Sequence, residues 1–354
     1  MYLNYSLWDK LRESQNPIFL YGTGNGADKI IEVLEKYNIK LSGIFASNGF
    51  VRDRYFHDFH INSYNNVISE YGNDIKILLA FGTTLPEVKT FIEQLDKNHD
   101  LYIPDVPLYG GDLFDMPYFM SHKSKLNNAR ELLYDEKSKS LFDDTVNFRL
   151  SGKYKYLLNT ESIETTLSEL FANKKIKKII DGGAFRGDSS EIFADIFSPD
   201  IIYSIEADPK TYTKLQKYAE SEQRCKIITI NAALSDIDGE VLYSSSGSRG
   251  AGEAGKNHRA KTSTTRCVKL DTVLPEQYID YIKLDIEGSE ETALRGSETL
   301  IKRCQPDMAV SIYHRTDDLF ELIFRLHELL PNHKLYLRRI DCIPMWDLTL
   351  YAVK

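Results

Sequence analysis

The stretch IIDGGAFRGDSS, at Ile179–Ser190, decides the fold. An apolar strand ends in Asp181, and a turn framed by Gly183 and Gly187 then leads into a helix. Glycine permits a tight turn and lets a ligand approach the backbone amides, because no Cβ stands in the way. The N–H groups at the start of the helix then face an anionic or polar ligand. The stretch therefore predicts the ligand-binding turn of a Rossmann-like domain.

A second apolar strand, IIYSIE at Ile201–Glu206, ends in an acid 25 residues after Asp181. An acid at this position can accept hydrogen bonds from the two hydroxyls of a ribose. We therefore predict that Glu206 anchors the ribose of a nucleoside ligand. The alternative is a strand-end carboxylate that simply faces solvent.

A third strand end carries acids in the stretch YIKLDIEGSE, at Tyr281–Glu290. Strand ends of a parallel sheet surround one crevice, so Asp285 and Glu287 should face the same cleft as Asp181 and Glu206. Two carboxylates there could flank a cation, bind a metal ion or polarise a hydroxyl. Alternatively, Asp285 only caps the helix that follows.

A histidine follows the next strand, in SIYHRTDD at Ser311–Asp318. Histidine is the usual base near neutral pH, and a hydroxyl that attacks an electrophile benefits from a base. His314 is therefore a candidate catalytic base. A structural histidine is the equal alternative.

Strands alternate with helices in both halves of the 354-residue chain, which is typical of parallel sheets and of two domains. We expect an α/β protein with a smaller Rossmann-like domain at 1–115, a helical connector at 116–159 and a larger Rossmann-like domain at 160–354. The closing segments HKLYLRRI and DLTLYAV predict an antiparallel edge on the larger sheet, which makes it mixed. The Gly- and Ser-rich basic stretch at 244–264 predicts a loop.

Composition and charge exclude several classes of protein. A net charge of −8 argues against a general nucleic-acid binder, which needs a basic field. No apolar run approaches the ~18 residues of a membrane span, and the N-terminus lacks the apolar core of a signal peptide. We therefore expect a cytoplasmic protein without a membrane span.

Several motifs in the second half together resemble one family. They are DGGAFRGDS, IEADP, NAALSDIDGE (Asn231–Glu240), LDTV (Leu270–Val273), IKLDIEGSE and the closing LYAV. From about residue 179 to the C-terminus the sequence resembles the FkbM family of S-adenosylmethionine-dependent methyltransferases. The connector and the histidine of SIYHRTDDL resemble a two-domain subset of that family, with an N-terminal Rossmann-like domain.

The resemblance implies a class I methyltransferase fold, S-adenosylmethionine as the methyl donor and an oxygen acceptor, often a sugar hydroxyl of a glycan or polysaccharide precursor. His314, Asp285 and Glu287 are the catalytic candidates, and a divalent metal, if one is used, would bind Asp285 and Glu287. Phe185 departs from the Asn or Tyr that family members often carry there. The donor-binding candidates are Asp181, Gly182, Gly183, Ala184, Gly187, Asp188, Glu206, Ala207 and Asp236.

A second glycine turn lies near the N-terminus, where Gly22, Gly24 and Ala27 form a GxGxxA pattern after a strand. About 20 residues on, where NAD-binding proteins carry an acid, this chain has Ser47 and Asn48. The segment looks like the small domain that precedes some sugar-modifying acyltransferases. Acceptor or nucleotide-sugar binding, a purely structural role and homodimer formation all remain open. An NAD-dependent oxidoreductase and a binding module without activity are the rival functions.

Overall fold

A computed structural model describes residues 2–48, 51, 54–107, 109–245, 252–253 and 261–354. The chain forms two compact units. The first unit comprises Met1–Lys125, Ser140–Thr160 and Arg339–Asp347, and the second comprises Leu126–Lys139, Glu161–Arg338 and Leu348–Lys354. A short segment near the C-terminus thus belongs to the first unit. The domain limits expected at residues 115 and 159 remain predictions.

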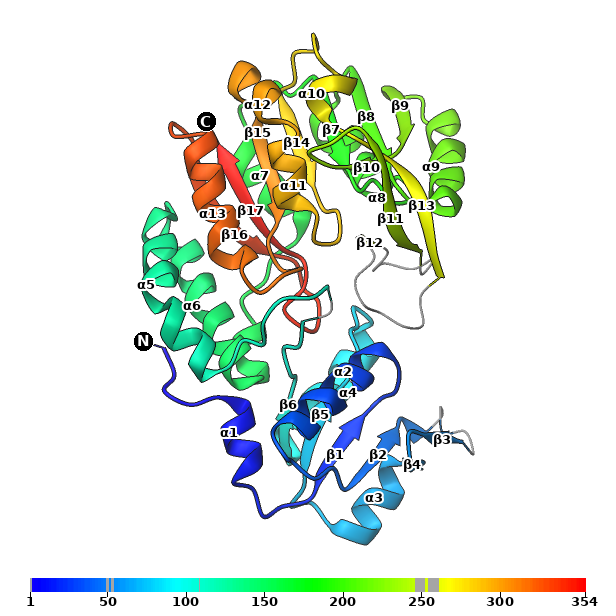
Figure 1. The fold of residues 1–354 in the computed structure, drawn as a ribbon, viewed down its shortest axis with the longest axis vertical. Helices are drawn as coiled ribbons and strands as arrows, with labels where there is room; N and C mark the ends of the chain where they lie inside the picture. Colours follow the sequence, from blue (N-terminus) through cyan, green and yellow to red (C-terminus); the bar gives the residue numbers. More distant parts are fainter. Residues whose placement is uncertain (1, 49–50, 52–53, 108, 246–251, 254–260) are drawn as a thin grey trace. The chain divides into compact units, whose positions relative to one another are not determined.

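The first unit is built on a six-stranded sheet in the order β3-β4-β2-β1-β5-β6 (Figure 1). The pairs within β4-β2-β1-β5-β6 are parallel, and β3 pairs with β4 antiparallel. The strands are β1 (Ile18–Tyr21), β2 (Gly43–Ala46), β3 (Tyr55–Phe56), β4 (Phe59–Ser63), β5 (Lys76–Leu79) and β6 (Asp100–Tyr102). The helices α1 (Leu7–Arg12), α2 (Asn25–Lys36), α3 (Tyr64–Tyr71) and α4 (Pro86–Asn98) accompany them.

Strand β1 shows why both faces of this sheet are covered. Successive side chains of a strand point to opposite faces. Ile18 and Leu20 accordingly belong to one core cluster, whereas Phe19 and Tyr21 belong to another. The apolar stripe of α2, with Ile31 and Leu34, packs into the first of these clusters.

The second unit is built on a seven-stranded sheet in the order β16-β17-β15-β14-β7-β8-β9. The pairs from β15 to β9 are parallel, and β17 pairs with β15 antiparallel. The sheet is therefore mixed, which confirms the predicted fold class. Its strands are β7 (Lys178–Gly182), β8 (Ile201–Glu206), β9 (Lys226–Asn231), β14 (Tyr281–Leu284), β15 (Asp307–Ser311), β16 (Lys334–Arg339) and β17 (Leu348–Val353).

Helices follow the strands of the second unit, and others form the connecting region. The second unit contains α7 (Ile163–Phe171), α8 (Asp188–Phe197), α9 (Pro209–Ser221), α10 (Leu270–Val273), α11 (Glu290–Arg295), α12 (Glu298–Cys304) and α13 (Asp318–Leu329). The predicted connector contains α5 (Met116–Leu132), α6 (Glu136–Ser151) and the 3₁₀ helix η2 (Tyr154–Leu157). Within the described ranges, no helix has both the length and the apolar character needed to cross a membrane.

A small sheet in the order β10-β13-β11-β12 lies in the second unit, in the region predicted to contain a loop. Its strands are β10 (Ala233–Leu234), β11 (Gly239–Ser245), β12 (Gly252–Glu253) and β13 (Lys261–Val268). β11 and β13 run antiparallel side by side (Figure 1). The ends of the predicted loop at 244–264 are thus strands, because each finds its backbone partner across the hairpin. Residues 246–251 and 254–260 of that stretch lie outside the described residues.

Candidate active site

Three neighbouring parallel strands bring the predicted site residues to one sheet edge. Gly182 of β7 is in register with Ile205 of β8 on one side and with Leu284 of β14 on the other. The residues that follow these positions, Gly183, Glu206 and Asp285, therefore emerge at the same edge. In an open α/β sheet, this carboxyl edge is where ligands bind.

Glycine is required twice in the turn after β7. Gly183 has φ 75°, and a Cβ at this residue would lie 1.9 Å from the carbonyl oxygen of Asp285. Gly187 has φ 102°, and its Cβ would lie 2.2 Å from the ring of Tyr218. The N–H groups of Gly183 and Ala184 both donate to the carbonyl oxygen of Ile205 at 3.0 Å. The close approach of the Asp285 backbone to Gly183 and of the Tyr218 ring to Gly187, together with positive φ at both, thus explains the two glycines.

The other turn residues predicted to bind the donor differ in exposure. Gly182 is buried, and a Cβ there would meet the side chain of Leu234 at 2.9 Å. Ala184 is fully buried. Asp188, the first residue of α8, is exposed. Of these three residues, only Asp188 has a side chain open to a ligand.

Asp181 is fully buried and joins β7 to the first turn of α8. Its Oδ2 atom accepts hydrogen bonds from the hydroxyls of Ser189 at 2.7 Å and Ser190 at 2.6 Å. Its Oδ1 atom lies 3.3 Å from Nζ of Lys283. Asp181 thereby holds the glycine turn in place, and the donor contact predicted for it stays a prediction.

Lys283 is a site residue that the sequence reasoning missed. It lies on β14, and its Nζ donates to the carbonyl oxygen of Gly183 at 2.9 Å and lies 3.9 Å from Oδ2 of Asp285. Burial by itself lowers the pKa of Lys283, but Asp181 and Asp285 outweigh burial and raise it. A lysine inside the apolar strand YIKL was the available signal, because a buried ammonium group needs a carboxylate partner.

Glu206 reaches back from β8 to the glycine turn. Its carboxylate accepts the N–H of Phe185 at 3.0 Å and the N–H of Asp208 at 2.8 Å. Burial, followed by the charge of Asp208, raises the pKa of Glu206 to about 7, although the two N–H bonds and Lys283 oppose this. The next residue, Ala207, accepts with its carbonyl oxygen from Thr265 at 3.1 Å. The arrangement leaves an acid at the position where a ribose is expected.

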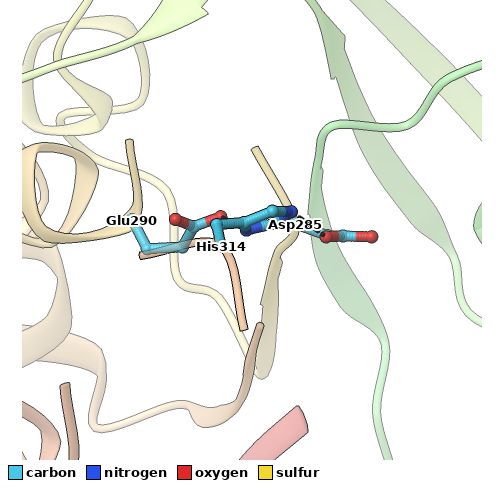
Figure 2. Close-up of side chains that lie close together, drawn as sticks. All are labelled: Asp285, Glu290 and His314. Atoms are coloured by element: carbon cyan, nitrogen blue, oxygen red, sulfur yellow. Dashed lines mark ion pairs between the residues drawn. The ribbon is translucent and has the colours of Figure 1, made fainter. Parts of the chain in front are cut away.

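Three acids gather around the buried imidazole of His314. Its Nδ1 lies 2.9 Å from Oε1 of Glu290, and its Nε2 lies 3.6 Å from Oδ1 of Asp285 and 3.4 Å from Oε2 of Glu287. Figure 2 shows the imidazole between Glu290 and Asp285. Tyr313 adds a hydroxyl that donates to Asp285 at 3.3 Å. The structure thus brings together all three predicted catalytic residues and adds Glu290.

The acids control the charge of His314. Burial by itself lowers the pKa of His314, but Glu290, Glu287 and Asp285 raise it well above its ordinary value. Burial by itself raises the pKa of Asp285, but Lys283 and then His314 lower it below its ordinary value. In this arrangement the three acids favour the protonated form of the imidazole. The base role predicted for His314 requires that this proton first be released.

Two residues complete the comparison with the sequence prediction. Glu290 was missed as a member of the acid cluster; its only signal was its position five residues after Asp285. Asp236, a predicted donor contact, lies 3.6 Å from Nε of Arg295. It stands two residues beyond Leu234, which packs on Gly182. Its donor role remains a prediction.

Comparisons with known proteins agree with this geometry. Residues 181–337 match the family described as the methyltransferase FkbM domain. The whole fold is similar to the crystal structure of methyltransferase FkbM from Methylobacillus flagellatus KT, with 19% sequence identity, a TM-score of 0.74, and coverage of 98% of this chain and 92% of that one. No curated protein matches the sequence significantly.

Weaker structural similarities cover about half of the chain. Aeropyrum pernix fibrillarin in complex with S-adenosyl-L-methionine shares 14% identity and a TM-score of 0.33 over 54% of this chain and 73% of its own. A precorrin-6y C5,15-methyltransferase from Geobacter metallireducens GS-15 shares 9% identity and a TM-score of 0.34 over 57% of this chain and 93% of its own. TM-scores this low support no inference. The family match over residues 181–337 and the full-length similarity in fold are therefore the findings that count, the second for the fold alone. Residues 181–337 match the methyltransferase FkbM domain, which confirms the FkbM resemblance seen in this part of the sequence, whereas the two-domain subset stays a prediction.

Proposed function

We propose that this protein transfers a methyl group from S-adenosylmethionine to a hydroxyl of a sugar or of a glycan or polysaccharide precursor. One observation carries the proposal. The glycine turn with Glu206 and the acid cluster around His314 follow strands that neighbour one another in the same sheet. A donor site and an acceptor site side by side are what a direct methyl transfer requires.

The donor side consists of the turn after β7 and the end of β8. Positive φ at Gly183 and Gly187 lets the backbone turn from β7 into α8, and Glu206 is the acid available to the ribose hydroxyls. Lys283 contacts both Asp181 and the backbone of Gly183, and these contacts hold the turn in place. The sulfonium group of the donor carries a positive charge, which nearby carboxylates favour.

The acceptor side consists of Asp285, Glu287 and His314. The acceptor oxygen forms a bond to the methyl carbon, while the bond between that carbon and the sulfonium sulfur breaks and S-adenosylhomocysteine leaves. The hydroxyl proton passes to this cluster. Asp285 and Glu287, whose side chains are 33% and 23% exposed, are the carboxylates near the buried imidazole that can contact the acceptor hydroxyl. Alignment of the reactants supplies most of the rate enhancement, because the donor is already reactive.

A calorimetric titration with S-adenosylhomocysteine tests the donor side. We expect binding to one site in the wild type, a large loss of affinity in Glu206→Ala, and no change in Glu220→Ala, which alters an exposed acid on α9. No binding at millimolar ligand would contradict the proposal.

The acceptor class needs a separate test. The purified protein and S-adenosylmethionine are incubated with sugars and polysaccharide precursors, and each product is analysed by mass spectrometry for one added methyl group. We expect the methyl group on oxygen. Transfer to nitrogen, or to nucleic acid instead of these acceptors, would contradict the proposed substrate class.

A further inference from the structure

We propose that Asp285, Glu290 and His314 bind a divalent metal cation. Each residue offers one ligand atom, and the three atoms lie within 4.8 Å of one another (Figure 2). Two of these residues were candidates for the acceptor side, and the third, Glu290, adds a carboxylate that is 1% exposed. The inference rests on the proposed function, because it assigns the cation to the acceptor side of the same site.

The carboxylate of Glu290 is the observation that points to a ligand. Its Oε1 atom accepts the N–H of Ile286 at 2.9 Å and lies at the same distance from Nδ1 of His314. Its Oε2 atom is buried and makes no hydrogen bond with any described residue. A buried carboxylate oxygen without a partner costs free energy that a bound cation removes.

The charges of the cluster favour a divalent cation. Asp285, Glu287 and Glu290 all lie within 3.6 Å of the imidazole of His314. A protonated imidazole would balance only one of these three carboxylates, and the neutral imidazole that a metal ligand requires balances none. The nearest described ammonium group, on Lys283, lies 3.9 Å from Asp285 but only 3.3 Å from Asp181, so it is shared.

The local backbone directs these side chains toward one another. Glu287 and Gly288 have φ values of 57° and 94°, so the chain turns sharply between Asp285 and α11. The turn brings Glu290, the first residue of α11, back beside the loop that holds Asp285, where the N–H of Ile286 fixes its carboxylate. The ligand atoms are therefore held by backbone geometry.

The donor set indicates which cation fits and what it would hold. Carboxylate oxygens together with one imidazole nitrogen suit Mg²⁺ and Mn²⁺. Such ions prefer six ligands, so three protein ligands leave positions for acceptor oxygens. A hydroxyl bound to the ion loses its proton more readily. An acceptor with two neighbouring oxygens, such as the vicinal diol of a sugar, would fit this site.

Titration of the purified full-length protein with Mn²⁺ alone, followed by electron paramagnetic resonance, tests the site. We expect one tightly bound Mn²⁺ in the wild type and an affinity at least about tenfold weaker in Glu290→Gln. The matched control is Glu291→Gln, the same change at the next residue of α11, whose side chain is 46% exposed. The control should bind Mn²⁺ as the wild type does.

Two outcomes would overturn the proposal: no Mn²⁺ bound by the wild type at millimolar concentration, or unchanged affinity in Glu290→Gln. If Glu290→Gln does not fold, Asp285→Asn replaces it, since Asp285 is partly exposed, and the same loss is expected. Binding of S-adenosylhomocysteine is measured on the same samples without metal. Failure of that binding would contradict the proposed function, whereas failure of Mn²⁺ binding alone would contradict only the metal site.

Discussion

The two units of the molecule contain the same glycine turn with different surroundings. After β1, the N–H of Gly22 donates to the carbonyl oxygen of Phe45 at 3.0 Å; after β7, the N–H of Gly183 donates to that of Ile205 at 3.0 Å. Both glycines have positive φ. A Cβ at Gly22 would strike the ring of Phe81 at 2.6 Å. The glycine pattern therefore reports the geometry of a strand that turns into a helix.

The neighbouring side chains differ, and they carry the chemistry. Around the first turn, Tyr21 stacks on Phe45 and bonds through its hydroxyl to Ser47, the residue that follows β2. Around the second turn, Glu206 follows Ile205, whose carbonyl accepts from Gly183; the first turn has Ala46 at the equivalent position, after Phe45. The carboxylate of Glu206 bonds the backbone of Phe185. Aromatic packing fills the first site, whereas buried charges surround the second. The charged residues after the neighbouring strands are therefore the feature that favours a ligand at the second turn.

The largest expected effect is a loss of stability when the ammonium group of Lys283, which contacts the second turn, is removed. Lys283→Met leaves the buried carboxylate of Asp181 without its ammonium partner, so the free energy of unfolding should fall by about 3–5 kcal/mol. Lys177→Met, which removes a surface pair with Asp200, should cost less than about 1 kcal/mol. Chemical denaturation measures both. Equal effects of the two variants would contradict the larger contribution to stability expected of the buried pair.

Replacing one glycine of each turn by alanine distinguishes the free-energy cost of a steric clash from the cost of backbone strain. Gly183→Ala places a Cβ 1.9 Å from a backbone oxygen and should destabilise the protein by at least about 3 kcal/mol and weaken donor binding. Gly24→Ala also requires a positive φ, in a region that is essentially limited to glycine, but its Cβ meets no described atom within 4 Å, so about 1–3 kcal/mol of backbone strain alone is expected. Denaturation and donor titration of both variants check this. A tolerated Gly183→Ala would contradict the close approach.

Glu206, beside the second turn, should make the free energy of unfolding depend on pH, and the first turn has no equivalent acid. Its pKa is raised to about 7 in the folded protein, above its ordinary value. Between about pH 4.5 and 7 the folded protein therefore holds a proton that the unfolded chain releases, and stability falls as pH rises through this range, by about 2–3 kcal/mol in total. Glu206→Gln should remove this dependence. Unfolding midpoints from about pH 5 to 8 measure it, and parallel curves for wild type and variant would contradict it.

The smallest effect is expected in the first turn. Ser47→Ala removes the partner of the Tyr21 hydroxyl and should cost about 1 kcal/mol of stability. Affinity for S-adenosylhomocysteine should stay within twofold of the wild type. Thermal unfolding and calorimetry check the two expectations. A marked loss of donor affinity would place a donor contact in the first unit and end the distinction between the two turns.

Much of the fold could be read from short stretches of sequence. The strands that end at Asp181 and Glu206, the helices after them and the glycines at 183 and 187 were predicted because periodicity and turn chemistry are local properties. The same reasoning placed Asp181, Glu206 and Asp285 at strand ends. The same reasoning predicted a loop at 244–264 and missed the strands at its ends. A hairpin strand such as β11 is stabilised by its partner across the sheet and not by an apolar pattern of its own.

The sequence by itself determined that this chain turns twice through glycine after a buried strand and that acids follow the strands of its second half. Only the tertiary structure decided which charges meet. Lys283 reaches Gly183, 100 residues away in sequence, because β14 and β7 pair in one register. Glu290 reaches His314 because the chain reverses at Glu287 and Gly288. Contacts of this range depend on strand order and register, which no local pattern of residues encodes.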